Sequence, residues 1–156
     1  MSLTKYQHLP NTPVICTGDK TLNLTELSNN NILLYFYPKD STPGCTTEGQ
    51  NFKASHHDFL QSDCLIFGIS RDSISSHDNF KAKQQFPFDL ISDPHEILCQ
   101  YFDVIKLKKL YGKEYLGIER STFLFHQGSC IQEWRKVKVK DHVAEVLNYL
   151  QKLSKP

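Results

Sequence analysis

Cys45 stands in a stretch whose residue types and spacing favour thiol chemistry. It follows Ile32–Tyr37, a continuously apolar or aromatic run that ends at Pro38, which is typical of a buried β-strand. Pro43 suits the first position of a helix and Thr42 suits the N-cap, so Cys45 is predicted in the first helical turn. The unpaired N–H groups and positive end of the helix favour the thiolate there, and the thiolate is the reactive form of cysteine.

A helix terminus by itself activates a thiol only weakly. It contributes about 0.3 to 2 kcal/mol, whereas lowering a cysteine pKa from about 8.5 to about 6 requires roughly 3.4 kcal/mol. A second cation is therefore needed near the sulfur. Arg120 is the preferred candidate because it immediately precedes the apolar run Ser121–Phe125 and would enter the site from a neighbouring strand end. On residue grounds alone, Arg71 and Arg135 compete with it.

These residues resemble those of a known family. Pro38, Thr42 and Cys45 match the Pro-x-x-x-Thr-x-x-Cys signature of peroxiredoxins, and nearly the whole chain is similar to the peroxiredoxin Q or bacterioferritin comigratory protein branch. Further matching stretches are residues 68–73, 76–80, 92–94, 111–113 and 117–123. The resemblance implies thiol-dependent reduction of hydrogen peroxide or organic hydroperoxides in antioxidant defence, with Cys45 as the peroxidatic cysteine that cycles through a sulfenic acid and with no cofactor.

Peroxide reduction requires more than a deprotonated sulfur. Charge moves onto the leaving oxygen as the O–O bond breaks, and donors already aimed at that oxygen lower the barrier. We expect these donors to be the Thr42 hydroxyl, the N–H of Cys45 or its neighbour, and the Arg120 guanidinium. Pro38 is expected to pack over the sulfur and limit water access. Glu48, one turn beyond the cysteine, is interpreted as a simple helix former.

The chain departs from its relatives in the thiol that would resolve the sulfenic acid. The two positions at which members of this branch carry a resolving cysteine are occupied by Gln50 and Lys81. We therefore expect an external thiol, such as thioredoxin or a glutathione/glutaredoxin system, to complete a one-cysteine cycle. Cys99, Cys64 or another local thiol is the alternative after local unfolding, although a free cysteine on a strand or helix is ordinarily a small core hydrophobe.

The apolar pattern predicts the elements that position this stretch. The first strand, the Cys45 helix and a second apolar strand at Cys64–Ser70 predict a parallel pair with a right-handed crossover. Phe52, Phe59 and Leu60 share one face of the helix and predict a core-facing stripe that runs to about residue 61.

The remaining elements predict a thioredoxin-like α/β fold with a central mixed β-sheet flanked by helices and an N-terminal hairpin extension, in a single domain over residues 1–156. They are a hairpin within residues 14–24, a helix capped by Asp72 or Ser73, a short strand at 90–92, a helix beginning at Asp93–Pro94, a hairpin turning at 126–129 and a C-terminal helix. Residues 106–113, with four lysines, are interpreted as a solvated loop and not as a nucleic-acid contact.

Composition restricts the class of protein and its partners. The chain is 39% hydrophobic and 22% charged, and its net charge of +1 provides no field that would attract nucleic acid or an anionic membrane. No segment approaches the roughly 20 apolar residues of a membrane span, and the first eight residues contain no apolar signal region, so we expect a cytoplasmic protein. The resemblance implies a monomer. Five cysteines without a Cys-x-x-Cys pair argue against a disulfide framework.

Two functions of other classes stay open. A thiol-disulfide oxidoreductase is disfavoured because the chain has no Cys-x-x-Cys pair. A non-catalytic binding module with a thioredoxin fold is disfavoured because it need not retain Pro38, Thr42, Cys45 and Arg120 together. The adjacent pair His56 and His57 diverges on a helix and has no carboxylate or cysteine at a spacing that would complete a site, and His77, His126 and His142 are scattered, so we expect no metal site.

Overall fold

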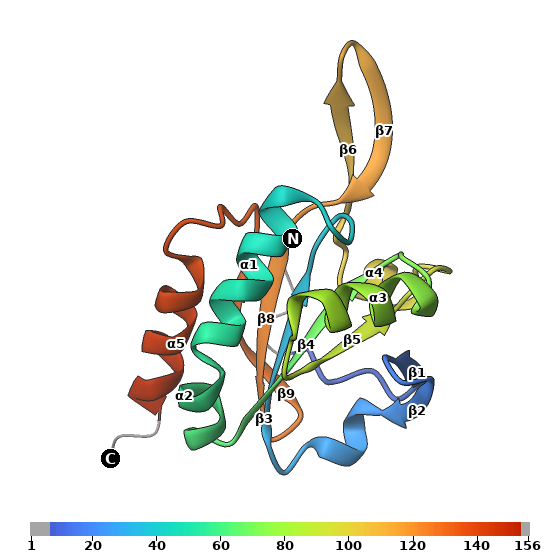
Figure 1. The fold of residues 1–156 in the computed structure, drawn as a ribbon. Coiled ribbons are helices and arrows are strands. Elements are labelled where there is room, and N and C mark those ends of the chain that lie inside the picture. The colour runs from blue at the N-terminus through green and yellow to red at the C-terminus, as the bar shows by residue number, and fades with distance from the viewer. Residues whose placement is uncertain (1–6, 154–156) are drawn as a thin grey trace.

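The fold is described for residues 7–153 in a computed structural model (Figure 1). Residues 1–6 and 154–156 lie outside the described residues. They include both ends of the expected domain and most of the segment expected to lack a signal region. The strands are β1 (Pro13–Cys16), β2 (Lys20–Asn23), β3 (Asn31–Phe36), β4 (Cys64–Ser70), β5 (Asp89–Ser92), β6 (Ile105–Leu110), β7 (Lys113–Ile118), β8 (Ser121–His126) and β9 (Ser129–Trp134). The helices are a 3-10 helix (Leu24–Leu27), α1 (Pro43–Ala54), α2 (His56–Gln61), α3 (Ile74–Gln84), α4 (Ile97–Tyr101) and α5 (His142–Leu153).

The main sheet is mixed and places β3 near its centre. Its strand order is β2-β1-β5-β4-β3-β8-β9. β3 is parallel to β4 and antiparallel to β8, while the β1–β2 hairpin extends the edge next to β5. The expected parallel pair, the N-terminal hairpin at the sheet edge and the thioredoxin-like α/β class are therefore confirmed.

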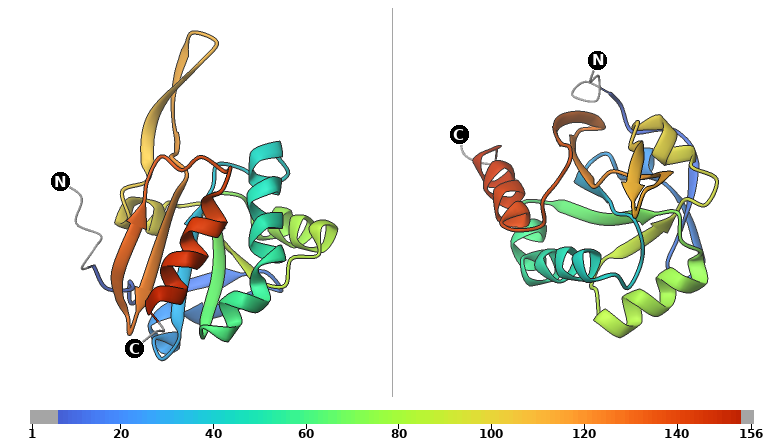
Figure 2. Two further views of the ribbon diagram at one scale, coloured as in Figure 1. Left: turned by 90° about the vertical axis from the view of Figure 1, so that its left-hand side faces the viewer. Right: turned by 90° about the horizontal axis from the view of Figure 1, so that it is seen from above.

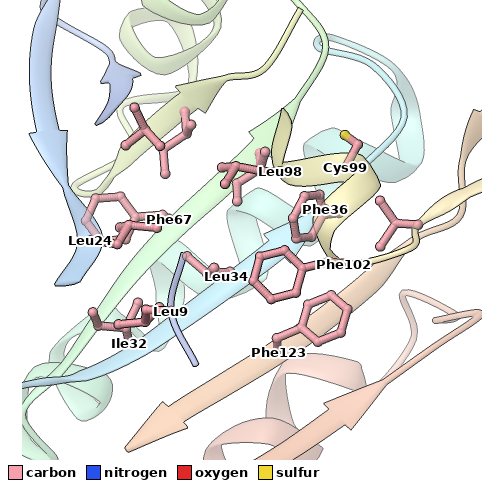
Figure 3. Packing of buried hydrophobic residues seen from close by; sticks show 14 of the residues in the cluster. Leu9, Leu24, Ile32, Leu34, Phe36, Phe67, Leu98, Cys99, Phe102 and Phe123 are labelled. Carbon is pink, nitrogen blue, oxygen red and sulfur yellow. The ribbon is translucent and has the colours of Figure 1, made fainter. Parts of the chain in front are cut away.

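Helices cover both faces of this sheet. α1, α2, α3 and α5 lie on one face, and the short α4 lies on the other (Figure 2). β3 alternates between the two cores as a two-sided strand should. Leu34 and Phe36 join the cluster under α4 (Figure 3), whereas Leu33 and Tyr35 join the cluster that also contains Cys45. β3 is thus anchored on both sides, which makes it a rigid base for the segment that follows it.

The helix expected to run without a break from Cys45 to residue 61 is in fact two helices. α1 ends at Ala54, Ser55 has φ −100° and ψ 4°, and α2 then begins at His56. Phe59 is fully buried as predicted, but Leu60 is 45% exposed, so its assignment to the core is wrong. The break at Ser55 interrupts the regular rotation on which the predicted stripe depended.

The interpretation of residues 106–113 as a loop is also wrong. They belong to a two-stranded hairpin, β6–β7, that projects from the body of the molecule (Figure 1). Tyr111 (φ 52°) and Gly112 (φ 77°) form its two-residue turn, with Leu110 paired to Lys113. Two successive residues with positive φ match the twist of a β-hairpin. The lysine content concealed this strand pattern, although most side chains of the hairpin are solvent-exposed as expected.

α4 begins later than predicted. It starts at Ile97 and not at Asp93–Pro94, because Glu96 adopts a left-handed conformation (φ 60°) that a helix cannot include. The Asp93 carboxylate instead accepts hydrogen bonds from the N–H groups of Leu98 (3.1 Å) and Cys99 (2.8 Å). Asp93 therefore satisfies the free end of a helix that it does not belong to. None of the helices within residues 7–153 combines the length and the apolarity that crossing a bilayer requires.

Candidate active site

Cys45 lies in the first turn of α1, as the sequence predicts. Thr42 is the N-cap residue with extended backbone (φ −86°, ψ 154°), and Pro43 occupies the first helical position. The N–H of Thr46 donates to the Thr42 carbonyl at 2.9 Å, so the N–H of Cys45 belongs to the group that a helix leaves without an internal partner. Cys45 is 2% exposed. Cys45 therefore lies at the positive end of α1 and is almost fully buried.

Thr42 occupies the expected position but makes a different hydrogen bond from that of an N-cap. Its side chain does not cap α1; the hydroxyl donates to the carbonyl oxygen of Lys39 at 2.8 Å. Because a hydroxyl has one hydrogen, only its lone pairs are left for a molecule that enters the site. Pro38, half-buried, starts the same loop. The loop between β3 and α1 thus presents Thr42 as an acceptor.

Arg120 reaches the sulfur from the strand next to β3. Ser121, the first residue of β8, pairs with Phe36 at the end of β3, which places Arg120 beside the start of the Cys45 loop. Its Nη2 lies 3.4 Å from Cys45 Sγ and its Nη1 lies 2.6 Å from a carboxylate oxygen of Glu48. Burial lowers the pKa of Arg120, but the charges of Glu48 and Cys45 outweigh burial and raise it. The structure therefore places Arg120 as a cation at the sulfur.

The interpretation of Glu48 as a simple helix former is wrong. Glu48 is fully buried, forms the ion pair with Arg120, and its second oxygen, Oε2, has no hydrogen-bond partner among residues 7–153. Burial raises the pKa of Glu48 to about 7, against the opposing effect of Arg120. A sequence signal was available: residues three apart share a helix face, so Glu48 had to point the same way as the buried Cys45.

Gly44 leaves the space that the guanidinium occupies. A Cβ at this position would lie 3.3 Å from Nη2 of Arg120, which is closer than almost all real Cβ contacts. Any side chain here would displace the same nitrogen that contacts the sulfur. Gly44 is therefore part of the geometry that allows Arg120 to approach Cys45.

The two competing arginines are engaged elsewhere. Arg71 pairs with Glu96 at 2.8 Å, and Arg135 pairs with Glu133 at 3.1 Å while its guanidinium lies 5.2 Å from the centre of the Phe123 ring. Neither guanidinium is placed at the sulfur. Of the three arginines considered from the sequence, Arg120 is the one that the structure brings to Cys45.

Lys108 on β6 is a further charge near the site. Burial and the charge of Arg120 lower the pKa of Lys108, while Cys45 acts in the opposite direction. Lys108 therefore lies within electrostatic range of both Arg120 and Cys45. The sequence placed these lysines in a loop and assigned them no relation to the cysteine.

The other four cysteines are not placed to react with Cys45 in the folded state. All five are free, and Cys16, Cys64, Cys99 and Cys130 are 1% exposed or less. Burial raises the pKa of each thiol, to about 11 for Cys16, about 12 for Cys64 and Cys130, and higher for Cys99.

Their positions in the sheet agree with this. Cys16, Cys99 and Cys130 belong to the core on the face opposite Cys45. Cys64 lies on the same face but at the first residue of β4, whereas Cys45 follows the last residue of the parallel strand β3. The seven residues of β4 therefore separate the two thiols by about 20 Å.

The positions that carry a resolving cysteine in similar proteins have polar partners here. Gln50 donates from Nε2 to the carbonyl oxygen of Gln84 at 3.1 Å, and Lys81 pairs with Asp89 at 2.6 Å. Both residues tie α3 to its surroundings. A thiol is absent at both positions.

Comparisons with known proteins agree with this geometry. A family model described as the AhpC/TSA family matches residues 6–133. The chain is 54% identical to peroxiredoxin Bcp of Bacillus subtilis (strain 168) over 136 residues, which cover 86% of this chain and 87% of that protein. It is 52% identical to peroxiredoxin Bcp of Xanthomonas campestris over 140 residues, with 89% and 88% covered.

Solved structures are similar over almost the full length. One of Xanthomonas campestris peroxiredoxin Q aligns with a TM-score of 0.91 and 48% identity, covering 98% of this chain and 100% of that chain. Another, of the bacterioferritin comigratory protein of the same organism, concerns its alkyl peroxide reduction activity and aligns with a TM-score of 0.89 and 49% identity, covering 94% and 97%.

Proposed function

The chain belongs to the AhpC/TSA family and, within it, to the Bcp or peroxiredoxin Q thiol peroxidases, and from this premise we propose that Cys45 is its peroxidatic cysteine. The observation that carries the proposal is the guanidinium of Arg120, which bridges Cys45 Sγ at 3.4 Å and Glu48 at 2.6 Å. A fixed cation at a helix N-terminus stabilises the thiolate and the charge that develops beside it.

The first chemical step transfers one oxygen to sulfur. The Cys45 thiolate attacks the terminal oxygen of a hydroperoxide, the S–O bond forms as the O–O bond breaks, and the electron pair of that bond leaves with the alkoxide or hydroxide. The leaving group takes up a proton and departs as an alcohol or water, and Cys45 becomes a sulfenic acid.

Thr42 and Arg120 have complementary roles in this step. The Thr42 hydroxyl already donates to Lys39, so it accepts the hydrogen of the peroxide O–H and orients that oxygen toward the sulfur. The Arg120 guanidinium donates to the oxygens and disperses the negative charge as the bond breaks. Pro38, which has no N–H, limits the access of water to the same space.

An external thiol completes the cycle. Its thiolate attacks the sulfenic sulfur of Cys45 and releases water, and a second thiol then reduces the mixed disulfide and restores Cys45. The remote, buried positions of Cys16, Cys64, Cys99 and Cys130 support this one-cysteine cycle over an internal disulfide. A thioredoxin or a glutathione/glutaredoxin system has the required chemistry.

The peroxide is hydrogen peroxide or an organic hydroperoxide. The alkyl peroxide reduction activity named for the Xanthomonas campestris relative supports the organic class. Stopped-flow rates with hydrogen peroxide, tert-butyl hydroperoxide and cumene hydroperoxide rank the substrates directly. A rate that falls steeply with each added alkyl or aryl group would restrict the function to hydrogen peroxide.

Substitution of single cysteines tests the assignment of Cys45. We expect Cys45→Ser to abolish peroxide turnover and Cys99→Ser to retain it. Intact mass after one equivalent of hydrogen peroxide should increase by one oxygen, as a sulfenic acid does, whereas loss of two hydrogens would indicate an internal disulfide. An inactive Cys99→Ser variant with an intact fold would overturn the one-cysteine cycle.

A further inference from the structure

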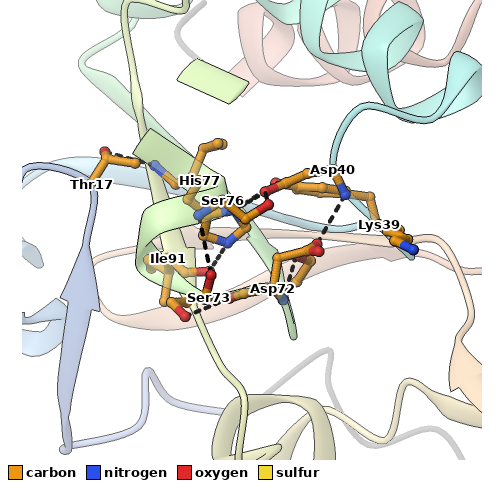
Figure 4. A network of polar contacts seen from close by, with 12 residues as sticks. Thr17, Lys39, Asp40, Asp72, Ser73, Ser76, His77 and Ile91 are labelled. Atoms are coloured by element: carbon orange, nitrogen blue, oxygen red, sulfur yellow. Dashed lines mark hydrogen bonds and ion pairs between the residues drawn. The ribbon is translucent and has the colours of Figure 1, made fainter. Parts of the chain in front are cut away.

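The loop between β3 and α1 is fastened to the rest of the protein through Asp40. This residue is 6% exposed, and its carboxylate accepts hydrogen bonds from the Tyr37 hydroxyl (2.6 Å), the Ser76 hydroxyl (2.8 Å) and the Nδ1 of His77 (2.7 Å). Its backbone N–H donates to Asp72 Oδ2 at 2.9 Å. Figure 4 shows how these groups converge from the loop, from α3 and from the end of β4.

His77 is fully buried, and both of its ring nitrogens face acceptors. Nδ1 faces the Asp40 carboxylate and Nε2 lies 2.9 Å from the carbonyl oxygen of Ile91 on β5. A carbonyl can only accept, so Nε2 carries a hydrogen. Burial raises the pKa of Asp40, but the hydrogen bonds from His77 and Tyr37 outweigh burial and lower it, so the carboxylate is ionised. Nδ1 lies at hydrogen-bond distance from this carboxylate, so both ring nitrogens are engaged and the ring is held between the loop and β5.

The polar groups around this ring form hydrogen bonds with one another. Besides Asp40, the titratable side chains that face it are Tyr37 at the end of β3 and Asp72 after β4, while α3 contributes the Ser76 hydroxyl and β5 a carbonyl. Asp40, Asp72 and His77 have ligand atoms within 4.8 Å of one another. These atoms are already hydrogen-bonded, however, since Asp72 Oδ2 accepts from the Ser70 hydroxyl and the Asp40 N–H. The arrangement is a network of satisfied hydrogen bonds, and we do not assign a cation to it.

The anchored loop also carries part of the active site. Ser41 adopts a left-handed conformation (φ 63°) directly before Thr42, and the Thr42 hydroxyl is bonded back to Lys39. A strained non-glycine residue persists only where its surroundings hold it. Since α1 begins one residue after Thr42, any movement of Asp40 is transmitted to Thr42 and to the helix end that carries Cys45.

We propose that His77 is a positioning residue for the reaction at Cys45: its buried ring holds Asp40, and through Asp40 it fixes the loop that sets Thr42 and the start of α1 against Arg120. The inference rests on the proposed function of Cys45. It makes the reaction depend on a histidine that never touches the peroxide. When the ring is replaced, its hydrogen bond to the Asp40 carboxylate is lost and the loop relaxes.

The principal test compares the rate constant of peroxide reduction at neutral pH in the wild type and in His77→Gln. His77→Gln should react about ten to a hundred times more slowly, as expected when reacting groups are misplaced by about 1 Å. A variant that matches the wild type would overturn the proposal.

Ile32→Val is the control for a general loss of stability. Ile32 is fully buried near the opposite end of β3 and belongs to the core on the face away from Cys45. It should lower the midpoint of urea unfolding while leaving the rate constant close to that of the wild type. A comparable loss of rate in Ile32→Val would show that His77 acts only through global stability and would overturn its positioning role.

A double-mutant cycle with Asp40→Asn tests whether His77 acts through Asp40. If it does, the double variant should be no slower than the slower single variant, because each change breaks the same link. Multiplicative losses would contradict the proposal.

The outcomes also separate this inference from the function on which it rests. A wild-type protein that forms no sulfenic acid at Cys45 would refute the proposed function. Normal oxidation of Cys45, together with an unaltered His77→Gln variant, would refute only the role of His77.

Discussion

Glu48 and Asp40 are two buried carboxylates that lie on either side of Cys45 in the sequence, and each is paired with a basic side chain. Glu48 has one partner, Arg120, and its second oxygen has none among residues 7–153. Asp40 accepts from three side chains, including His77. The pKa of Glu48 is raised to about 7 because burial dominates, whereas the pKa of Asp40 is lowered because hydrogen bonds dominate.

The difference shows that burial alone does not determine the charge of a carboxylate. Hydrogen-bond donors compensate for the lost water at Asp40 and leave it a firm anchor. At Glu48 that compensation is incomplete, so Arg120 is paired with a carboxylate whose pKa is raised. Both carboxylates act on Tyr35: burial, then Glu48, then Cys45 and Asp40 raise the pKa of its hydroxyl. We interpret the Asp40 side as the fixed support and the Glu48 side as the electrostatically adjustable part of the site.

Substitution of Arg120 should remove both the ion pair with Glu48 and the guanidinium at Cys45, and it should have the largest effect. Arg120→Met keeps the length of the side chain but leaves Glu48 without its cation, which costs about 3 to 5 kcal/mol for a buried pair. It also removes a donor to the reacting oxygens, so the rate constant should fall by about 10² to 10³. Stopped-flow kinetics and urea unfolding measure both effects. Arg135→Met is the matched control, since its guanidinium pairs with Glu133 and not with Cys45; an equal loss of rate there would contradict the comparison.

Glu48→Gln should reveal how much of the cost of burying the Glu48 carboxylate is left uncompensated. Because the folded-state pKa is raised from 4.5 to about 7, the native state binds more protons than the unfolded state between these values, and the wild type should lose stability as pH rises through this window. The loss should be roughly 3 kcal/mol and should disappear in the variant. Urea unfolding at several pH values measures it. Glu145→Gln, exposed on α5, controls for the loss of one carboxylate, and identical pH profiles for the wild type and Glu48→Gln would disprove the raised pKa.

Asp40→Asn should show the opposite pH dependence. The lowered pKa of Asp40 means that its carboxylate stabilises the fold above the unfolded pKa, and that this contribution is lost as pH falls through the folded value. At neutral pH the variant should be less stable than the wild type by about 1 to 3 kcal/mol, because a buried donor of His77 or Ser76 loses its acceptor. The difference should close below about pH 4. Thermal unfolding across this range measures it, and a gap that widens on acidification would contradict the assignment.

The smallest change, Gly44→Ala, should separate activity from stability. Alanine is favoured over glycine inside a helix by about 0.5 to 1 kcal/mol, so unfolding should be unaffected or slightly harder. The new methyl group would lie 3.3 Å from Nη2 of Arg120 and should lower the rate constant by about threefold to tenfold, which corresponds to roughly 1 kcal/mol. A variant that reacts as fast as the wild type would show that Arg120 tolerates displacement.

Local signals in the sequence were sufficient for the strand, the turn and the helix that carry Cys45. Thr42 and Pro43 are read directly as the start of α1, and the apolar run before them as β3. Arg120 was preferred because it precedes an apolar run, but nothing in the spacing relates it to Cys45, so the family signature was needed to favour it over Arg71 and Arg135. Leu60 was misplaced because one break at Ser55 changes every later position on a helical face. The β6–β7 hairpin was missed because lysines occupy many of its positions.

The sequence by itself determined the fold class, the buried strand at its centre and the position of Cys45 at a helix start, because capping, proline placement and hydrophobic periodicity act over a few neighbouring residues. Only the tertiary structure decided which charges meet around that cysteine. Glu48 and Arg120 are 72 residues apart and Asp40 and His77 are 37 apart, and their protonation depends on burial and on hydrogen-bond partners that exist only after the sheet and its helices have assembled.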